Sequence, residues 1–466
     1  MSRINTNVDS LIAQRVLRSN NNSLSKSLER LSTGLKINKG ADNPAGLIAS
    51  ENLRAEKVGI TTAIRNAERA SNIIGTAEGG LGEISALLTE LQGLVGEAAN
   101  SGGLSDEEIA ANQLQVDSIL STINRIAGST NFQGKKLLDG SLDYTTENVT
   151  TTEITNLKIN SAKLPDGAEV SVVVDVVTSA QTAQVTFAGL SLTTTNTIQV
   201  TGNLGTEQLS FAASTSLADI ATAINAVKEA TGVSATVNGS DLQLNSTAFG
   251  SAQFVTVTAV AGSNFSDAED TGRDAVVNVN GAAAQASGLS ISYRSNNLDI
   301  EFDLAEAFNV DGNSSTFQIT GGGATFALGS KVSETDKASL GIASVTTASL
   351  GNASLGYLST LGTGGENSLS SDNLVAAQKI LDKAIKQVSQ LRGRLGAFQK
   401  FTVNSTINSL GVALENASAA ESAIRDTDFA EETANLTRSQ ILAAAATSVL
   451  AAANSNPQSV LTLLRG

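Results

Sequence analysis

The sequence predicts an α+β multidomain protein in which both chain ends form a long antiparallel coiled-coil helical bundle, with an inserted, mostly β region that contains a short helix. Three observations predict this class. Apolar residues recur at three- and four-residue steps at both ends, seven-residue ladders follow inward from each end, and alternating apolar and polar runs fill the middle. A length of 466 residues allows several domains with sizeable cores.

The first element, within residues 1–42, is an amphipathic helix. Thr6-Asn7-Val8-Asp9 predicts a capping box at its start. Seven basic residues against two acidic ones give residues 1–40 a net charge of +5. The apolar positions of this helix are Ile4, Val8, Leu11, Leu17, Leu24, Leu28 and Leu31.

The second element is a long helix from Pro44 to about Ala99, in a helical segment that we place at 43–145. One of its two seven-residue ladders is Ile60, Ala67, Ile74, Leu81, Leu88 and Val95. A strict seven-residue repeat over six heptads indicates a coiled-coil seam. Gly102-Gly103 ends this helix, and Ser105 caps a shorter antiparallel one that runs to about Ala127.

Residues 146–345 have the alternating pattern of antiparallel strands separated by turn residues. One helix is predicted here, from Leu217 to Ala230, after a capping box at Ser216. Between residues 141 and 340 there are 21 acidic and 7 basic residues, which indicates a solvated outer region. Solubility explains this charge better than calcium binding, because no D-x-[DN]-x-[DN]-G loop occurs.

The helical pattern returns at 346–426. Leu381, Val388 and Leu395 step by sevens, and the register then slips by one residue to Val403. A helix of this kind completes a bundle with residues 43–145. The ends of the inserted region should therefore lie close together.

The last segment, 427–466, has no charged side chain between Arg438 and Arg465. Polar residues interrupt it too often for a membrane span, and Pro457 predicts an end to its helix near Asn456. Such a terminus needs protein around it, and residues 415–435, with a net charge of −5, complement the basic N-terminal segment. Its apolar positions are Leu436, Ile441, Leu442, Val449, Leu450, Val460, Leu461 and Leu464.

The composition excludes several classes of function. The chain has no cysteine and no histidine, which removes thiolate zinc sites, disulfides and the common nucleophile–histidine pairs. A net charge of −15 argues against nucleic acid binding. We therefore expect no enzyme activity, no cofactor and no membrane insertion. The first residues lack the apolar stretch of a secretory signal.

Both ends resemble bacterial flagellin. The resemblance rests on INTNVDSLIAQRVL, SLERLSTGLKIN and AGLIAS near the start, and on INSLGVALENASAAESAIRDTDFAEETANLTRSQIL and PQSVLTLLRG near the end. TIQVTGNLGTEQLSF resembles the start of a module inserted in many flagellins and hook-associated proteins, and DAVVNVNG could begin a second copy.

This resemblance implies a structural subunit of an extracellular helical filament. Residues 1–42 and 427–466 would form the intersubunit filament core, 43–145 and 346–426 an inner tube of helices, and 146–345 the outer region. The seam of the inner-tube helices would be Ile60, Ile74, Leu81, Leu88, Val95, Leu381, Val388 and Leu395. The resemblance also implies export in an unfolded state without a cleaved signal, and as partners an export chaperone, hook-associated proteins and a cap protein.

Two departures from the family pattern stand out. Alanines occupy 443, 444 and 452, where relatives usually carry glutamines, which predicts a drier core layer. Flagellins recognised by the innate immune receptor for this family carry arginine and glutamate where this chain has Glu90 and Gly93. Two alternatives remain open: a hook–filament junction protein of the same family, and a filament subunit whose outer region acts as an adhesin.

Overall fold

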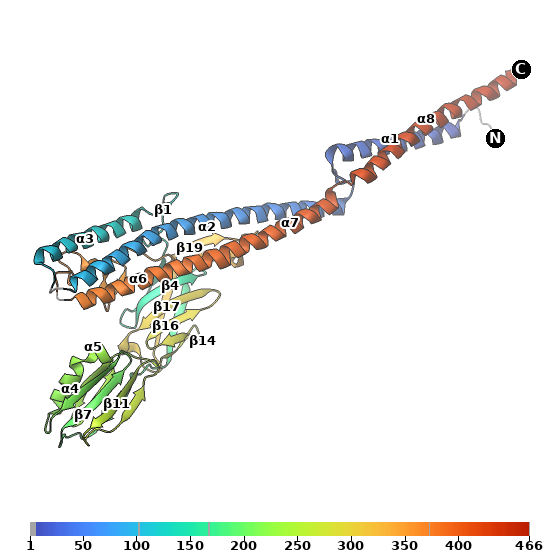
Figure 1. The fold of residues 1–466 in the computed structure, drawn as a ribbon. Coiled ribbons are helices and arrows are strands. Elements are labelled where there is room, and N and C mark those ends of the chain that lie inside the picture. The colour runs from blue at the N-terminus through green and yellow to red at the C-terminus, as the bar shows by residue number, and fades with distance from the viewer. Residues whose placement is uncertain (1–5, 101–102, 166–167, 372, 466) are drawn as a thin grey trace. The chain divides into compact units, whose positions relative to one another are not determined.

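The computed structural model describes residues 6–100, 103–165, 168–371 and 373–465, except the side chains of 457–465 (Figure 1). The chain divides into two compact units. The first comprises Met1–Glu68, Leu328–Val332 and Asn404–Gly466, and the second comprises Arg69–Ala327 and Ser333–Val403.

The helices lie toward both ends of the chain, as the sequence predicts. The long predicted helix is confirmed as α2, and the shorter helix after it as α3, whose start has the capping box formed by Ser105 and Glu108. The helices are α1 (Val8–Thr33), α2 (Pro44–Ala98), α3 (Asp106–Ser129), α4 (Leu217–Ala226), α5 (Lys228–Thr231), α6 (Leu374–Ala397), α7 (Ser405–Arg425) and α8 (Phe429–Arg465).

In the first unit, α2 and α7 run antiparallel. Lys57 Nζ lies 2.8 Å from Glu421, and Arg425 lies 2.8 Å from Glu51. Residue numbers rise along one helix as they fall along the other. These two ion pairs fall outside the predicted complementarity between residues 1–40 and 415–435, because Lys57 and Glu51 both lie after residue 40.

In the second unit, α2 and α6 are also antiparallel neighbours. Arg392 Nε lies 2.8 Å from Glu78, and Gln399 donates a hydrogen bond of 2.9 Å to Ser71. The ladder residues Ile74, Leu81, Leu88 and Val95 are buried, as are Leu381, Val388 and Leu395.

A π-helical turn, η4 (Phe398–Asn404), connects α6 to α7. It coincides with the one-residue slip between the buried side chains of Leu395 and Val403, which are eight residues apart instead of seven. A π turn accommodates one extra residue, so it brings the apolar face back into line. Phe398 also packs against Phe326, with ring centroids 6.0 Å apart.

The strands between α3 and α6 form two β modules, each with its own core. The first β module pairs a five-stranded sheet, in the order β14-β13-β5-β18-β3, with a four-stranded sheet, β15-β16-β17-β4, around one apolar core. Its strands are β3 (Tyr144–Glu147), β4 (Ile154–Ala162), β5 (Val170–Thr178), β13 (Val276–Val279), β14 (Ala282–Ala283), β15 (Gln285–Ser287), β16 (Ser290–Arg294), β17 (Leu298–Leu304) and β18 (Ser314–Gly322).

The second β module is inserted in sequence between β5 and β13. A four-stranded sheet, β12-β11-β7-β8, and a three-stranded sheet, β6-β10-β9, share a core with α4. Its strands are β6 (Gln184–Phe187), β7 (Asn196–Gly202), β8 (Thr206–Phe211), β9 (Val233–Asn238), β10 (Asp241–Ser246), β11 (Phe254–Ala261) and β12 (Ala268–Thr271).

Three two-stranded hairpins complete the described strands. They are β1 (Asn131–Phe132) with β2 (Lys135–Lys136), β19 (Ala324–Ala327) with β20 (Lys337–Leu340), and β21 (Gly351–Asn352) with β22 (Gly356–Tyr357).

Four sequence predictions are wrong in detail. The helix predicted from Leu217 to Ala230 is interrupted at Val227, where α4 ends and α5 begins. DAVVNVNG does not start a second copy of the inserted module, because β13 pairs with β5 and β14 of the first β module. Asn7, not Thr6, caps α1.

The fourth error is the expected end of the C-terminal helix. α8 continues through Pro457 to Arg465. Proline lacks an N–H, so the carbonyl of Ala453, four residues earlier, loses its helical donor. The side chain of Asn7 supplies a replacement, since its Nδ2 donates a hydrogen bond of 2.7 Å to that carbonyl.

Candidate subunit interface

The two terminal helices, α1 and α8, lie side by side and antiparallel (Figure 1). Asn20 Nδ2 donates to the carbonyl of Leu442 at 3.1 Å, and Ser10 Oγ donates to Asn454 Oδ1 at 2.7 Å. Contacts more than 400 residues apart in sequence thus join the two ends of the chain.

Two backbone hydrogen bonds, which we call the backbone clasp, join the segment after α1 to the segment before α8. The N–H of Lys36 donates to the carbonyl of Arg425 at 2.7 Å, and that of Thr427 donates to Gly34 at 2.9 Å. Gly34 ends α1 with a φ of 73°, a left-handed conformation that glycine adopts without strain. The clasp therefore sets where α1 and α8 begin to run together.

Charged side chains reinforce the pair near the clasp. Arg30 Nη1 lies 3.3 Å from Glu432, whose side chain is buried. Lys26 Nζ lies 2.9 Å from Asp42 in the loop that follows α1. The hydrogen bond from Lys26, with the backbone N–H of Lys39, lowers the pKa of Asp42 to about 2.

The most buried residues of the α1–α8 pair are mostly small. The described residues buried on α1 are Ser10, Ala13 and Ser27, and those on α8 include Ala446 and Ala453. Small side chains let two helix backbones approach closely, but each buries little apolar area. Sequence reasoning missed these five positions because it followed the large apolar residues, although the spacing of Ala446 and Ala453 by seven is a usable signal.

The large apolar side chains of the pair remain partly or largely in solvent. Leu11 is 57% exposed and Ile441 is 63% exposed. Of the predicted filament-core residues, the exposed ones are Val8, Leu11, Leu28, Ile441, Leu442 and Val449, and the half-buried ones are Leu17, Leu24, Leu31, Leu436 and Leu450. Ile4, Val460, Leu461 and Leu464 were also predicted here and lie outside the residues whose side chains the structure describes.

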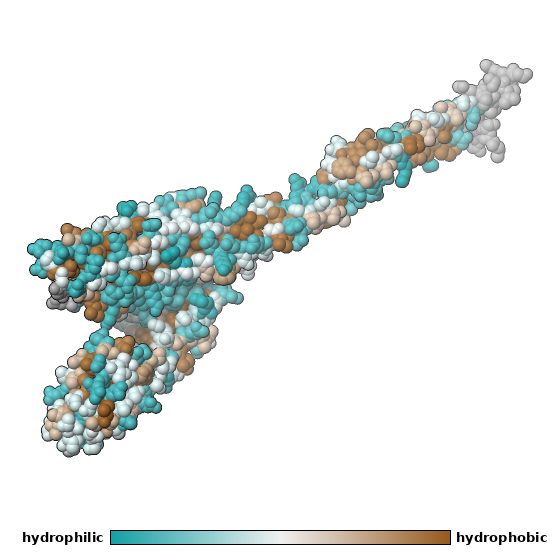
Figure 2. Space-filling model, in the orientation of Figure 1, coloured by the Kyte–Doolittle hydropathy of each residue, from teal (hydrophilic) through white to brown (hydrophobic). Residues whose placement is uncertain are grey.

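Four of the exposed apolar side chains, Ile12, Val16, Leu442 and Val449, line a groove of about 550 Å³ between the two helices, whereas Leu11 and Ile441 lie outside its lining. Ile12 and Val16 of α1 face Leu442 and Val449 of α8 across it. Figure 2 shows apolar residues gathered along the α1–α8 pair. An exposed apolar strip of this kind marks a surface that binds protein or lipid.

The sequence argument that polar residues rule out a membrane span at the C-terminal end is too strict, because α8 passes the test of length and composition. Phe429–Asn456 is long and apolar enough for a span, judged by length and hydropathy. In the structure this stretch packs against α1 instead, with Ala446 and Ala453 buried.

The remaining predicted site residues lie on α2. Ile60 is buried like the other ladder residues of α2, whereas Glu90 and Gly93 lie on the exposed face of the same helix. Within the described ranges, no group of three or more Asp or Glu side chains is arranged to hold a metal ion.

Protein-family models match the helical regions at both ends of the chain and part of the inserted region. The bacterial flagellin N-terminal helical region matches residues 4–143, the C-terminal helical region matches 378–464, and the flagellin hook IN motif matches 197–248. The last of these falls within the second β module.

Relatives match along nearly the whole chain. B-type flagellin of Pseudomonas aeruginosa is 31% identical, and flagellin of Salmonella typhimurium is also 31% identical, with 99% of each chain covered in both cases. Flagellin of Salmonella rubislaw is 30% identical over the same shares. The chain therefore belongs to the bacterial flagellins, the structural subunits of the flagellar filament.

Proposed function

We propose that this chain polymerises with copies of itself through the exposed apolar strip of α1 and α8. The observation that carries the proposal is the contrast within this helix pair: small residues are buried between the helices, while Leu11, Ile441 and Val449 face solvent. Burying apolar surface is favoured by about 25 cal/mol per Å². Neighbouring subunits that cover this strip gain that free energy.

The proposed filament has three layers. Residues 1–42 and 427–466 form the core, and residues 43–145 and 346–426 form an inner tube whose helices pair as coiled coils. The inserted region, 146–345, faces outward. Heterologous contacts that do not close generate a helical polymer, which is the form that a rotating propeller needs.

The same proposal covers export and partners. The exposed strip would be costly in a free monomer, so we propose that the terminal segments become ordered on assembly, after export in an unfolded state without a cleaved signal. The partners are then an export chaperone, hook-associated proteins and a cap protein. The rotating filament converts motor torque into thrust.

Electron microscopy after addition of filament seeds tests this proposal. We expect the intact protein to extend the seeds into tubes, and the chain lacking residues 436–466 to remain a soluble monomer with folded β modules. Polymerisation of the truncated chain would contradict the role of α8. Failure of the intact chain to extend competent seeds would favour a hook–filament junction protein.

The exposed face of α2 leads to a proposal about immune recognition. Glu90 places a negative charge where recognised relatives carry arginine, so activation of the innate receptor should be weak. Glu90→Arg combined with Gly93→Glu should raise the response of receptor reporter cells, with Glu83→Arg as the control for a general charge effect. Equal potency of the unchanged chain and the double variant would contradict this.

A further inference from the structure

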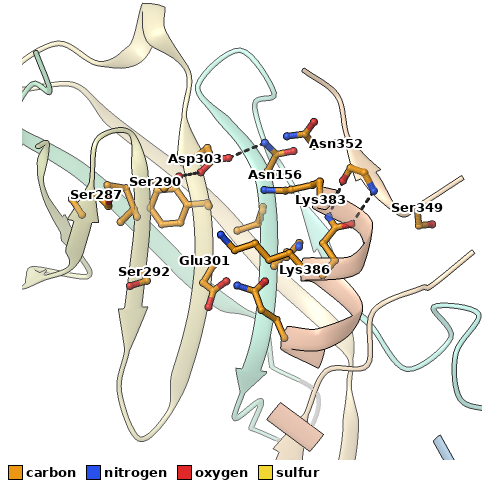
Figure 3. Close-up of a pocket in the computed structure, with 18 of the residues that line it drawn as sticks. Asn156, Ser287, Ser290, Ser292, Glu301, Asp303, Ser349, Asn352, Lys383 and Lys386 are labelled. Atoms are coloured by element: carbon orange, nitrogen blue, oxygen red, sulfur yellow. Dashed lines mark hydrogen bonds between the residues drawn. The ribbon is translucent and has the colours of Figure 1, made fainter. Parts of the chain in front are cut away.

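A pocket of about 550 Å³ in the second unit is lined by the sheet β15-β16-β17-β4 on one side and by α6 and β21–β22 on the other. Its volume is within the range of about 300–1,000 Å³ typical of ligand sites. Figure 3 shows Lys383 and Lys386 extending from α6 toward the strands that carry Glu301 and Asp303.

The helical wall of this pocket is fixed. Gln387 of α6 accepts a hydrogen bond of 2.8 Å from the N–H of Gly351 and donates one of 2.7 Å to its carbonyl. This two-way contact holds β21 against α6, and Asn352 and Tyr357 of the hairpin complete that wall. The wall therefore needs little rearrangement to receive a ligand.

The sheet wall presents two carboxylates that are held in place. Asp303 accepts a hydrogen bond of 2.8 Å from Asn156 and another from Ser290. Glu301 accepts one of 3.3 Å from Asn160, whose side chain is buried. Each carboxylate offers about four lone-pair positions, so both retain capacity to accept hydrogen bonds from ligand hydroxyl groups.

Three lysines and two carboxylates give the pocket lining a net charge of +1. Lys158, Lys383 and Lys386 outnumber the two carboxylates in the lining, whereas acidic residues outnumber basic ones by 21 to 7 between residues 141 and 340. In the described part of the chain, none of the three has an ion pair within 4.0 Å. Burial and the nearby charge of Lys383 lower the pKa of Lys158, and the carboxylates of Glu301 and Asp303 oppose this shift only in part.

The remaining lining is rich in neutral hydrogen-bonding groups. Tyr357 adds an aromatic ring with a polar tip. The other polar side chains are Gln285, Ser287, Ser290, Ser292, Ser349, Asn352 and Gln390. A ligand that matches this set has several hydroxyl groups and at least one negative charge.

We propose that this pocket binds a carboxylated carbohydrate, such as a short chain of uronic acid residues. The ligand carboxylate pairs with Lys383 and Lys386, and ring hydroxyls donate hydrogen bonds to Glu301 and Asp303. The amides and serines of the lining bind the remaining hydroxyls. This binding function is independent of polymerisation, since the pocket lies outside α1 and α8.

Isothermal titration calorimetry of the full-length monomer with trigalacturonate tests the proposal. We expect saturable binding that weakens as salt is raised, and weaker binding by at least tenfold for the neutral sugar maltotriose and for the non-sugar anion citrate. Maltotriose binding of equal strength would overturn the role of the lysines. Citrate binding of equal strength would overturn recognition of the sugar.

The variant Lys383→Gln/Lys386→Gln removes both charges while keeping polar side chains of similar length. We expect at least a tenfold rise in the Kd for trigalacturonate, with an unchanged circular dichroism spectrum. Lys135→Gln/Lys136→Gln is the matched control, because these two exposed lysines of β2 lie outside the pocket lining, and its Kd should not change. Absence of binding by the unchanged protein, or equal losses in both variants, would overturn the proposal.

Discussion

The α1–α8 pair and the α2–α6 pair begin from the same kind of sequence and reach opposite outcomes. Both have apolar residues at helical intervals, and both are antiparallel. In the α2–α6 region the large ladder residues are the buried ones, such as Leu81 and Leu88. In the α1–α8 pair the buried residues are small, and large ones such as Leu11 and Ile441 remain exposed.

Both regions bury small residues, among them Ala70 and Ala77 of α2, so the difference lies in the large apolar residues: in the α2–α6 region they are buried within one chain, and in the α1–α8 pair they are not. Leucines and isoleucines at the contact bury enough apolar area to stabilise the pair. In the α1–α8 pair the large residues remain available for contacts with other chains. The predictions below test this division, beginning with the largest expected effect.

Leu88→Ala should lower the free energy of unfolding of the monomer by about 2–5 kcal/mol, because it leaves a cavity in a fully buried seam. Urea unfolding followed by circular dichroism measures this change. Leu114→Ala on α3 is the matched control, since that leucine is 70% exposed and its loss should change stability by about 0.5 kcal/mol or less. Similar losses in the two variants would remove the distinction between buried and exposed leucines.

Leu442→Ala should weaken polymerisation while leaving the stability of the monomer almost unchanged. The side chain is exposed in the single chain, so monomer stability should change by about 0.5 kcal/mol or less. Covering the exposed half of this leucine in a polymer contributes about 1 kcal/mol, so the critical concentration for polymerisation should rise about fivefold. Sedimentation of polymer at graded concentrations measures it, and an unchanged critical concentration would contradict a subunit contact at Leu442.

Asn7→Ala should weaken the terminal pair by about 1 kcal/mol, because it removes the donor to the Ala453 carbonyl and the cap of α1. Pro457→Ala restores a helical N–H to that carbonyl, so the cost of Asn7→Ala should be smaller in its background. A double-mutant cycle on the polymerisation free energy measures this coupling. Strictly additive effects would show that the proline does not create the acceptor that Asn7 satisfies.

The smallest expected effect concerns pH. The pKa of Asp42 is lowered from 3.8 to about 2, so its contribution to the loop after α1 is complete above pH 4 and is lost as pH falls through about 2. Lys26→Gln should return this pKa toward 3.8, as measured by carboxyl NMR titration. Lys36→Gln, which changes a basic residue of the same loop that forms no ion pair with Asp42 in the structure, should leave it unchanged. An Asp42 pKa near 3.8 in the unchanged protein would contradict the contact.

Much of the fold could be predicted from the sequence because its signals are local. The proline at 44 and the cap at Ser105 place helix starts, and the eight-residue step from Leu395 to Val403 marks the later π-helical turn. Alternation predicted antiparallel strands within residues 146–345, where the structure has β5, β7, β10 and β13 among others. Each of these features depends on residues that are close together in the sequence, so the local pattern of residue types is enough to predict it.

What the tertiary structure decided depends on residues far apart in the chain. Three features have no local signal in the sequence. The second β module is inserted between β5 and β13, Asn7 donates a hydrogen bond to the Ala453 carbonyl, and Lys383 and Glu301 line the same pocket. The periodicity of apolar residues indicates which face of an element is buried, but it does not identify the element that packs against that face. It therefore predicted the large apolar residues of α1 and α8 and missed the small ones, such as Ala13 and Ala446, that only packing selects for the seam.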